Sequence, residues 1–237
     1  MTHVDLNLLA LDTSTDQLSV ALQRADGRRF AHTGAGGAQA SATLIPAVQA
    51  LLAQAGLSLS DLSAIAFGRG PGSFTGLRTA CSVAQGLAWG AGVPVLPIDT
   101  LLAVAEAARS AHGATHVLAL LDARMNEVYA AEYAWRDAAG WRPLSDIAVL
   151  APEAVPTPGA GAVLAGNAFA AYADRLPAAL QALPRIAALP SADALLNLAP
   201  ALLAAGAAVP AEQALPLYIR DKVAQTTAER SAAGLAR

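Results

Sequence analysis

Apolar residues in the first hundred positions follow two spacings, one typical of strands and the other of helices. Short runs that alternate or are continuously apolar predict five β-strands, at residues 6–11, 18–23, 28–33, 61–67 and 93–98. Polar or glycine-rich segments separate these runs, as expected for turns and loops. The first lobe is therefore predicted to begin with two strands joined by a turn.

Two helices are predicted between these strands, one over residues 41–55 and one over 74–89. The first has an apolar stripe at steps of three and four, formed by Leu44, Val48, Leu51 and Leu52. The second carries a ridge of small residues at steps of four, formed by Gly76, Ala80, Ala84 and Ala88. Because small side chains let a neighbouring helix approach closely, these two faces are candidates for a partner interface. Packing of the ridge on the protein's own sheet is the alternative.

The pattern of residues 9–20 recurs at 119–130. In both segments an apolar strand ends in an aspartate, Asp12 or Asp122, and a polar turn leads into a second strand. This offset of about 110 residues predicts two related lobes. Later in the chain we expect a loop at 150–161, a strand at 163–167 and helices at 168–176 and 192–205.

The predicted lobes divide the chain near residue 104. We place the first lobe at residues 1–104, completed by the C-terminal segment 210–230, and the second at 105–209. The longest apolar stretch, 194–211, is interrupted by Asn197 and two prolines, so we expect no membrane span.

Charge and cysteine content narrow the class of protein. The net charge of −3 argues against a surface built mainly for nucleic acid. Cys81 is the single cysteine and cannot form an internal disulfide. Since the N-terminus lacks a basic segment ahead of an apolar one, secretion is not indicated and a cytoplasmic location is expected.

The main candidate for chemistry is the glycine loop, GRGPGSFTGLR at residues 68–78, which joins a predicted strand to a predicted helix. Its glycines allow positive φ and close approach, and a helix N-terminus that follows such a loop suits a phosphate or carboxylate. A loop shaped only for close packing is the alternative. Neither the P-loop nor the G-x-G-x-x-G spacing is present, and Lys222 is the only lysine in the chain.

Five segments together resemble the TsaB (YeaZ) family: LALDTST at 9–15, the glycine loop at 68–78, VAQGLA at 83–88, LDARM at 121–125 and PLYIR at 216–220. The resemblance implies an α/β fold of the actin, sugar kinase and Hsp70 (ASKHA) type, with two lobes built on βββαβα cores. It also implies a role in forming N6-threonylcarbamoyladenosine (t6A) at position 37 of tRNAs that read codons beginning with A.

The resemblance further implies that the chain is a non-catalytic scaffold. The related transferase subunit TsaD binds a metal through an H-x-x-x-H motif, and the corresponding residues here, 99–104, contain no histidine. No cofactor is therefore expected on this chain, and ATP and metal are expected on partner subunits. The expected partners are TsaD, bound through the helices at 41–55 and 74–89, and the ATPase TsaE. Self-association through the same helices is expected without TsaD, and tRNA contact only through the complex.

An active enzyme, either an ASKHA-type small-molecule kinase or a metalloprotease-like hydrolase, is the alternative. A kinase would use the phosphate-type loops, which we interpret as degenerate: Asp12, Ser14, Gly68, Gly70, Gly72 and Ser73. Capping of its own turn is the preferred role for Asp12. A hydrolase needs a metal or a nucleophile. His112 and His116 have the H-x-x-x-H spacing, but no third ligand with a matching spacing is evident, so no metal site is predicted.

Overall fold

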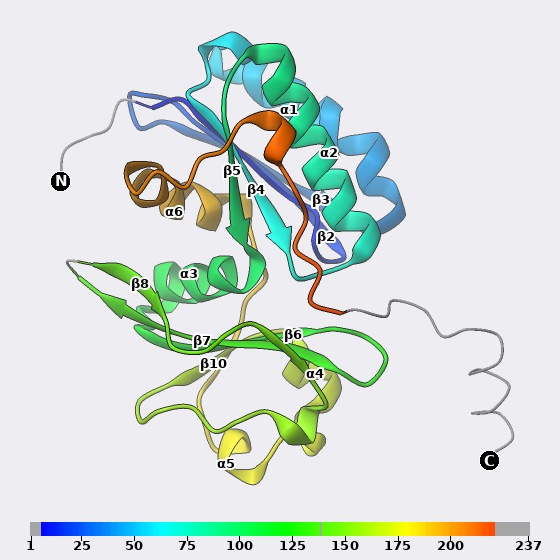
Figure 1. Cartoon of the computed structure of the whole chain (residues 1–237), viewed down its shortest axis with the longest axis vertical. Coiled ribbons are helices and arrows are strands. Elements are labelled where there is room, and N and C mark those ends of the chain that lie inside the picture. The colour runs from blue at the N-terminus through cyan, green and yellow to red at the C-terminus, as the bar shows by residue number, and fades with distance from the viewer. Residues whose placement is uncertain (1–5, 138, 221–237) are drawn as a thin grey trace, which may run out of the picture.

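Two sheets, one in each lobe, organise the chain in the computed structural model, which describes residues 6–137 and 139–220 (Figure 1). The first sheet has the order β3-β2-β1-β4-β5, with bounds β1 Leu8–Asp12, β2 Gln17–Gln23, β3 Arg29–Ala35, β4 Ala64–Gly70 and β5 Val95–Asp99. The second has the order β11-β10-β6-β7-β8, and β9 also pairs with β7. Its bounds are β6 His116–Asp122, β7 Val128–Arg136, β8 Gly140–Pro143, β9 Ala148–Leu150, β10 Val163–Gly166 and β11 Arg185–Ala187.

The two sheets repeat one topology. β1 is antiparallel to β2 and parallel to β4, and β6 is likewise antiparallel to β7 and parallel to β10. The predicted two-lobed, duplicated α/β fold is therefore confirmed. The duplication is incomplete, however, because the second lobe has no helix between β9 and β10, where only a 3-10 turn at Pro152–Ala154 occurs.

Helices cover both sheets, and a helix from the second half of the chain packs on the first sheet, whereas one from the first half packs on the second. The helix bounds are α1 Ala40–Ala55, α2 Phe74–Ala91, α3 Thr100–His112, α4 Ala168–Tyr172, α5 Ala178–Gln181 and α6 Ala192–Ala204. Helices α1 and α2 pack on one face of the first sheet, and α6 packs on its other face. Helix α3 packs on the second sheet and also contacts α6. Each half of the chain thus contributes a helix to the space between the sheets (Figure 1).

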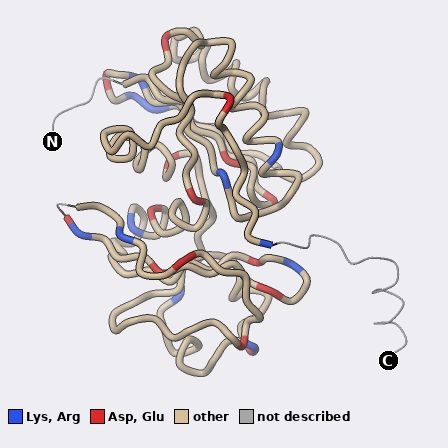
Figure 2. Tube along the Cα trace, in the orientation of Figure 1, with Lys and Arg blue, Asp and Glu red and all other residues tan. Residues whose placement is uncertain are grey.

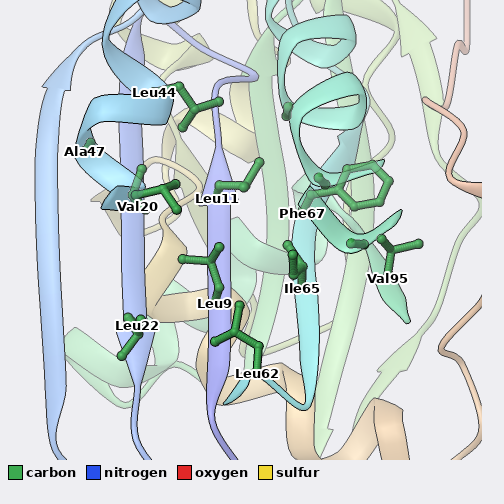
Figure 3. Packing of buried hydrophobic residues seen from close by; sticks show 14 of the residues in the cluster. Leu9, Leu11, Val20, Leu22, Leu44, Ala47, Leu62, Ile65, Phe67 and Val95 are labelled. Atoms are coloured by element: carbon green, nitrogen blue, oxygen red, sulfur yellow. The ribbon is translucent and has the colours of Figure 1, made fainter. Parts of the chain in front are cut away.

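Both faces of the central strands β1 and β4 are buried, because successive side chains point to opposite faces and helices cover the first sheet on each side. Leu9 and Leu11 of β1 pack toward α1 and α2 with Val20 and Phe67 (Figure 3), whereas Leu8 and Ala10 pack toward α6. Burial on both sides explains the continuous apolar runs of β1 and β4.

After α6 the chain returns to the first lobe. Val209 forms an isolated bridge with Val95, and the buried thiol of Cys81 on α2 donates a hydrogen bond to Ala214 O at 3.3 Å. Burial raises the pKa of this thiol. Residues 209–217 thus run along the first lobe, whereas Ile219 and Arg220 contact the second lobe. Residues 221–230 of the predicted segment and the tail beyond lie outside the described residues.

Candidate functional site

Two equivalent turns face each other between the lobes, one after β1 and one after β6. Each begins with an aspartate whose carboxylate accepts a hydrogen bond from a backbone N–H two residues later. Asp12 Oδ1 accepts from Ser14 N at 2.9 Å, and Asp122 Oδ1 accepts from Arg124 N at 2.7 Å. Arg124 also reaches across the gap to Asp16, with an Nη2 to Oδ2 distance of 2.7 Å. The repeat seen in the sequence therefore places matching turns on opposite sides of one cleft.

Asp12 is fully buried and serves its own turn. Its Oδ1 also accepts a hydrogen bond from Ser14 Oγ at 2.7 Å, while its Oδ2 is buried without a hydrogen-bond partner. A Cβ added at Gly68 would overlap this oxygen, so the backbone of β4 covers it. Burial raises the pKa of Asp12, and the hydrogen bonds from Ser14 oppose that rise. The side chain caps the turn and presents no open carboxylate oxygen to the cleft.

The glycine loop is filled by the first turn of the same chain. Ser73 N donates to Ser14 O at 2.7 Å, and Thr13 Oγ1 donates to Gly76 O at 2.7 Å. A Cβ added at Gly76 would lie 1.8 Å from the carbonyl oxygen of Thr13, and one added at Gly72 would lie 2.5 Å from the carbonyl oxygen of Ser14. The alternative considered from the sequence, a loop shaped for close packing, accounts for these glycines.

A cleft of about 380 Å³ remains between the lobes. Its lining includes residues from both turns, from the N-terminus of α2 and from β10's C-terminal end: Ser14, Asp16, Ser73, Asp122, Arg124 and Asn167. Asn167 Oδ1 accepts from Asp122 N at 2.9 Å, and Tyr172 donates its hydroxyl to Asp122 Oδ1 at 3.0 Å. The polar groups of the second turn are thus largely engaged within their own lobe.

The two histidines of the H-x-x-x-H motif lie on different secondary-structure elements, and His116 and the segment at 99–104 make contacts typical of structural residues. His112 ends α3, whereas His116 begins β6 and lies 2.6 Å from Glu132 through Nε2 and Oε1. Asp99 accepts a hydrogen bond from Arg69 Nε at 2.6 Å, just before α3 begins. Over residues 6–137 and 139–220, three or more His, Cys, Asp or Glu side chains nowhere gather as a potential metal site. Among the described helices, none is long and apolar enough to cross a bilayer.

The structure corrects the predicted interface residues. All eight are buried, and seven of them belong to the core of the first lobe: Leu44, Val48, Leu51, Leu52, Ala80, Ala84 and Ala88. The eighth, Gly76, faces the turn after β1. The apolar stripe and the small-residue ridge are therefore the inward faces of α1 and α2, because the sheet beneath them needs that cover.

The outward faces of these two helices form a different surface, which we call the outer helix surface: the exposed residues of α1 and α2. Among the 16 residues of α1 and the 18 of α2, Arg78 is the only charged one (Figure 2). Ile45, Phe74 and Trp89 are exposed on it, Trp89 to 69%. A shallow groove in it is lined by Ser41, Phe74, Thr75, Arg78, Thr79, Ser82 and Val83. A partly aromatic surface with a single charged residue is typical of protein–protein contacts.

The buried carboxylate of Asp12 allows a test by Asp12→Asn. Because the folded state holds the Asp12 proton to higher pH than the unfolded state, this group lowers stability as the pH rises. Asparagine keeps the acceptor for Ser14 without titrating. Urea unfolding at pH 8 should therefore give an unfolding free energy no lower than wild type, and any gain should vanish below about pH 3.9, the ordinary pKa of aspartate. A clear loss at pH 8 would show that the ionised carboxylate is needed.

Comparison with known proteins gives concordant matches. The family model described as TsaD, tRNA N6-adenosine threonylcarbamoyltransferase, matches residues 36–228. The tRNA threonylcarbamoyladenosine biosynthesis protein TsaB of Escherichia coli K12 is 39% identical over 224 residues, which cover 92% of this chain and 96% of that protein. The corresponding TsaB protein of Haemophilus influenzae is 50% identical over 127 residues, covering 53% of this chain and 52% of that protein.

A solved structure agrees over nearly the whole chain. YeaZ from Pseudomonas aeruginosa superposes with a TM-score of 0.83 at 43% identity, covering 90% of this chain and 99% of that one. The likeness in sequence and in structure confirms the resemblance carried by the five sequence segments. The chain therefore belongs to the TsaB (YeaZ) family.

Proposed function

We propose that this chain is a non-catalytic scaffold subunit of the assembly that forms t6A in tRNA. The observation that carries the proposal is that the glycine loop is occupied by the chain itself. Its glycines pack against the turn after β1, and the Asp12 carboxylate is buried beneath β4. A kinase of this fold would need that carboxylate and that loop to face ATP and magnesium. The names of the related TsaB proteins supply the pathway, t6A biosynthesis.

The outer helix surface supports a protein partner. Two adjacent helices that expose Ile45, Phe74 and Trp89, with Arg78 as their only charge, are poorly suited to remain in water. We propose that TsaD docks there, that TsaE joins the pair, and that two copies of this chain associate through the same surface when TsaD is absent. ATP and metal would then bind to partner subunits, and tRNA would be reached only through the complex, in the cytoplasm.

Reconstitution tests the function directly. Purified TsaD and TsaE, a tRNA that lacks the modification and an activated threonylcarbamoyl donor are incubated with and without this chain. Nucleoside analysis should detect t6A at a substantial rate only when the chain is present. The chain alone with Mg-ATP should release no phosphate above the blank. Full modification without the chain would refute the scaffold role, and turnover of ATP by the chain alone would favour the kinase.

A further inference from the structure

Residues 214–220 form a strap that runs from α2 across the glycine loop to the second lobe (Figure 1). It contains the PLYIR motif at 216–220, one of the segments that mark the family resemblance. On the first lobe, Leu217 N donates a hydrogen bond to Arg69 O at 2.7 Å. Gly70 has a φ of +126° and lies directly against Leu217 O, so a side chain at this position would displace the strap.

An aromatic contact holds the middle of the strap. The ring of Tyr218 lies 5.4 Å from that of Phe74 between centroids, and Arg78 Nε donates to the Tyr218 hydroxyl at 3.0 Å. The guanidinium of Arg78 also stacks over Phe74, at 3.9 Å from the ring centre. The start of α2 is thus built to receive the strap.

The end of the strap engages the second lobe. Arg220 donates to Ala123 O at 3.2 Å and pairs with Glu127, so its guanidinium spans the turn between β6 and β7. Only 15% of the Arg220 side chain is exposed. Next to it, Ile219 packs against the apolar cluster of the second lobe. A single segment of seven residues therefore contacts both lobes.

The turn that receives Arg220 has an unusual backbone. Three successive residues, none of them glycine, have a positive φ: Arg124 at 59°, Met125 at 53° and Asn126 at 61°. Such conformations cost free energy and persist where surrounding contacts hold them. Arg220 supplies one of those contacts, through Ala123 O and Glu127. The DARM and PLYIR motifs, about 95 residues apart, thus form the two halves of one contact.

We infer that the strap is a latch that holds the lobes together and controls the opening of the cleft. On the other side of the molecule α3 packs against α6, so that side can act as the hinge (Figure 1). Across the cleft itself the lobes share the Arg124–Asp16 ion pair, whose side chains are 69% and 84% exposed. An exposed pair of this kind contributes little. The better buried Arg220 contact therefore decides whether the cleft stays closed.

Spin-label distance measurements test the latch. Labels are placed at Gln49→Cys on α1 and Ala170→Cys on α4, both exposed positions, in a Cys81→Ser background. Arg220→Ala should raise the population with a longer interlobe distance by roughly tenfold, because charge-assisted hydrogen bonds are lost. Glu127→Gln, which keeps the size of the side chain, should act in the same direction. Circular dichroism verifies that each variant is folded.

The matched control is Arg28→Ala, which removes an ion pair with Asp26 that lies wholly within the first lobe. Its distance distribution should match that of the wild type. If Arg220→Ala and Glu127→Gln are folded and give the wild-type distribution, the latch is refuted. The same conclusion follows if Arg28→Ala opens the lobes as much as Arg220→Ala. The outcome does not depend on the proposed function, because no partner is present.

Discussion

Gly76→Ala should lower the free energy of unfolding by about 3 kcal/mol, although alanine is the better helix former. Its Cβ would overlap the carbonyl oxygen of Thr13, an atom of the backbone. That carbonyl has little freedom to move, because Thr13 Oγ1 is bonded to Gly76 O and the neighbouring Ser14 is held by Asp12. The strain must therefore separate α2 from the turn after β1 or distort both.

Gly86→Ala is the matched control for Gly76→Ala. Gly86 lies on the exposed side of the same helix, and an added Cβ there would have no neighbour within 4 Å. This variant should be more stable than wild type by about 0.5 to 1 kcal/mol, since alanine loses less backbone entropy. Urea unfolding of the isolated chain measures both variants. Equal and small effects at the two positions would show that the glycine loop is not rigidly packed against the turn.

The strands of the first sheet and the first two helices were predictable because each has a simple spacing, whereas the short strands β8, β9 and β11 were not predicted. The helix predicted at 74–89 is α2, Phe74–Ala91, and the strand predicted at 18–23 is β2, Gln17–Gln23. Helix α3 was missed although Leu101, Val104, Ala105 and Ala108 recur at steps of three and four and pack on the second sheet. It also contacts α6, and apolar residues such as Ala103 on that side make the stripe less distinct in the sequence.

The residues predicted for an interface lie on the buried faces of α1 and α2, because periodicity alone does not distinguish a core from a docking surface. Leu44 and Ala84 lie on the most regular apolar positions of their helices, and these are the positions that the sheet covers. The exposed residues Phe74 and Trp89 are 15 residues apart on α2, and two apolar positions at that distance do not form a recognisable stripe. The sequence does show that α1 and α2 are nearly free of charge on all their faces, and this is the feature from which an outward docking surface could have been proposed.

The glycine loop was recognised, but its occupant was not. Thr13 and Leu217, which contact the loop, are about 60 and 150 residues away from it in sequence, and nothing in the spacing of the glycines indicates them. A loop that cradles a phosphate and one that cradles backbone need the same freedom of conformation and the same lack of side chains. The distinction depends on tertiary contacts, which no local pattern contains.

Ser82→Arg should weaken the binding of TsaD by at least about 100-fold if the outer helix surface is the docking site. Ser82 is exposed on α2 and lines the groove beside Phe74 and Arg78. A second long cation there would fill the groove and become buried next to Arg78, and an unpaired buried charge is strongly unfavourable. Binding measured by calorimetry or surface plasmon resonance gives the loss, and sedimentation should show the same loss of self-association.

Thr157→Arg is the control for Ser82→Arg, since it adds the same charge at an exposed position of the second lobe. It should leave the affinity unchanged, and both variants should unfold within about 0.5 kcal/mol of wild type. Ala84→Glu, by contrast, would bury a carboxylate beneath α2 and should prevent folding, so it cannot report on the interface. Wild-type affinity of a folded Ser82→Arg would exclude this part of the outer helix surface, because a charge so placed cannot be accommodated within a tight contact. Partner binding would then have to use a part of the surface that does not include the groove beside Ser82.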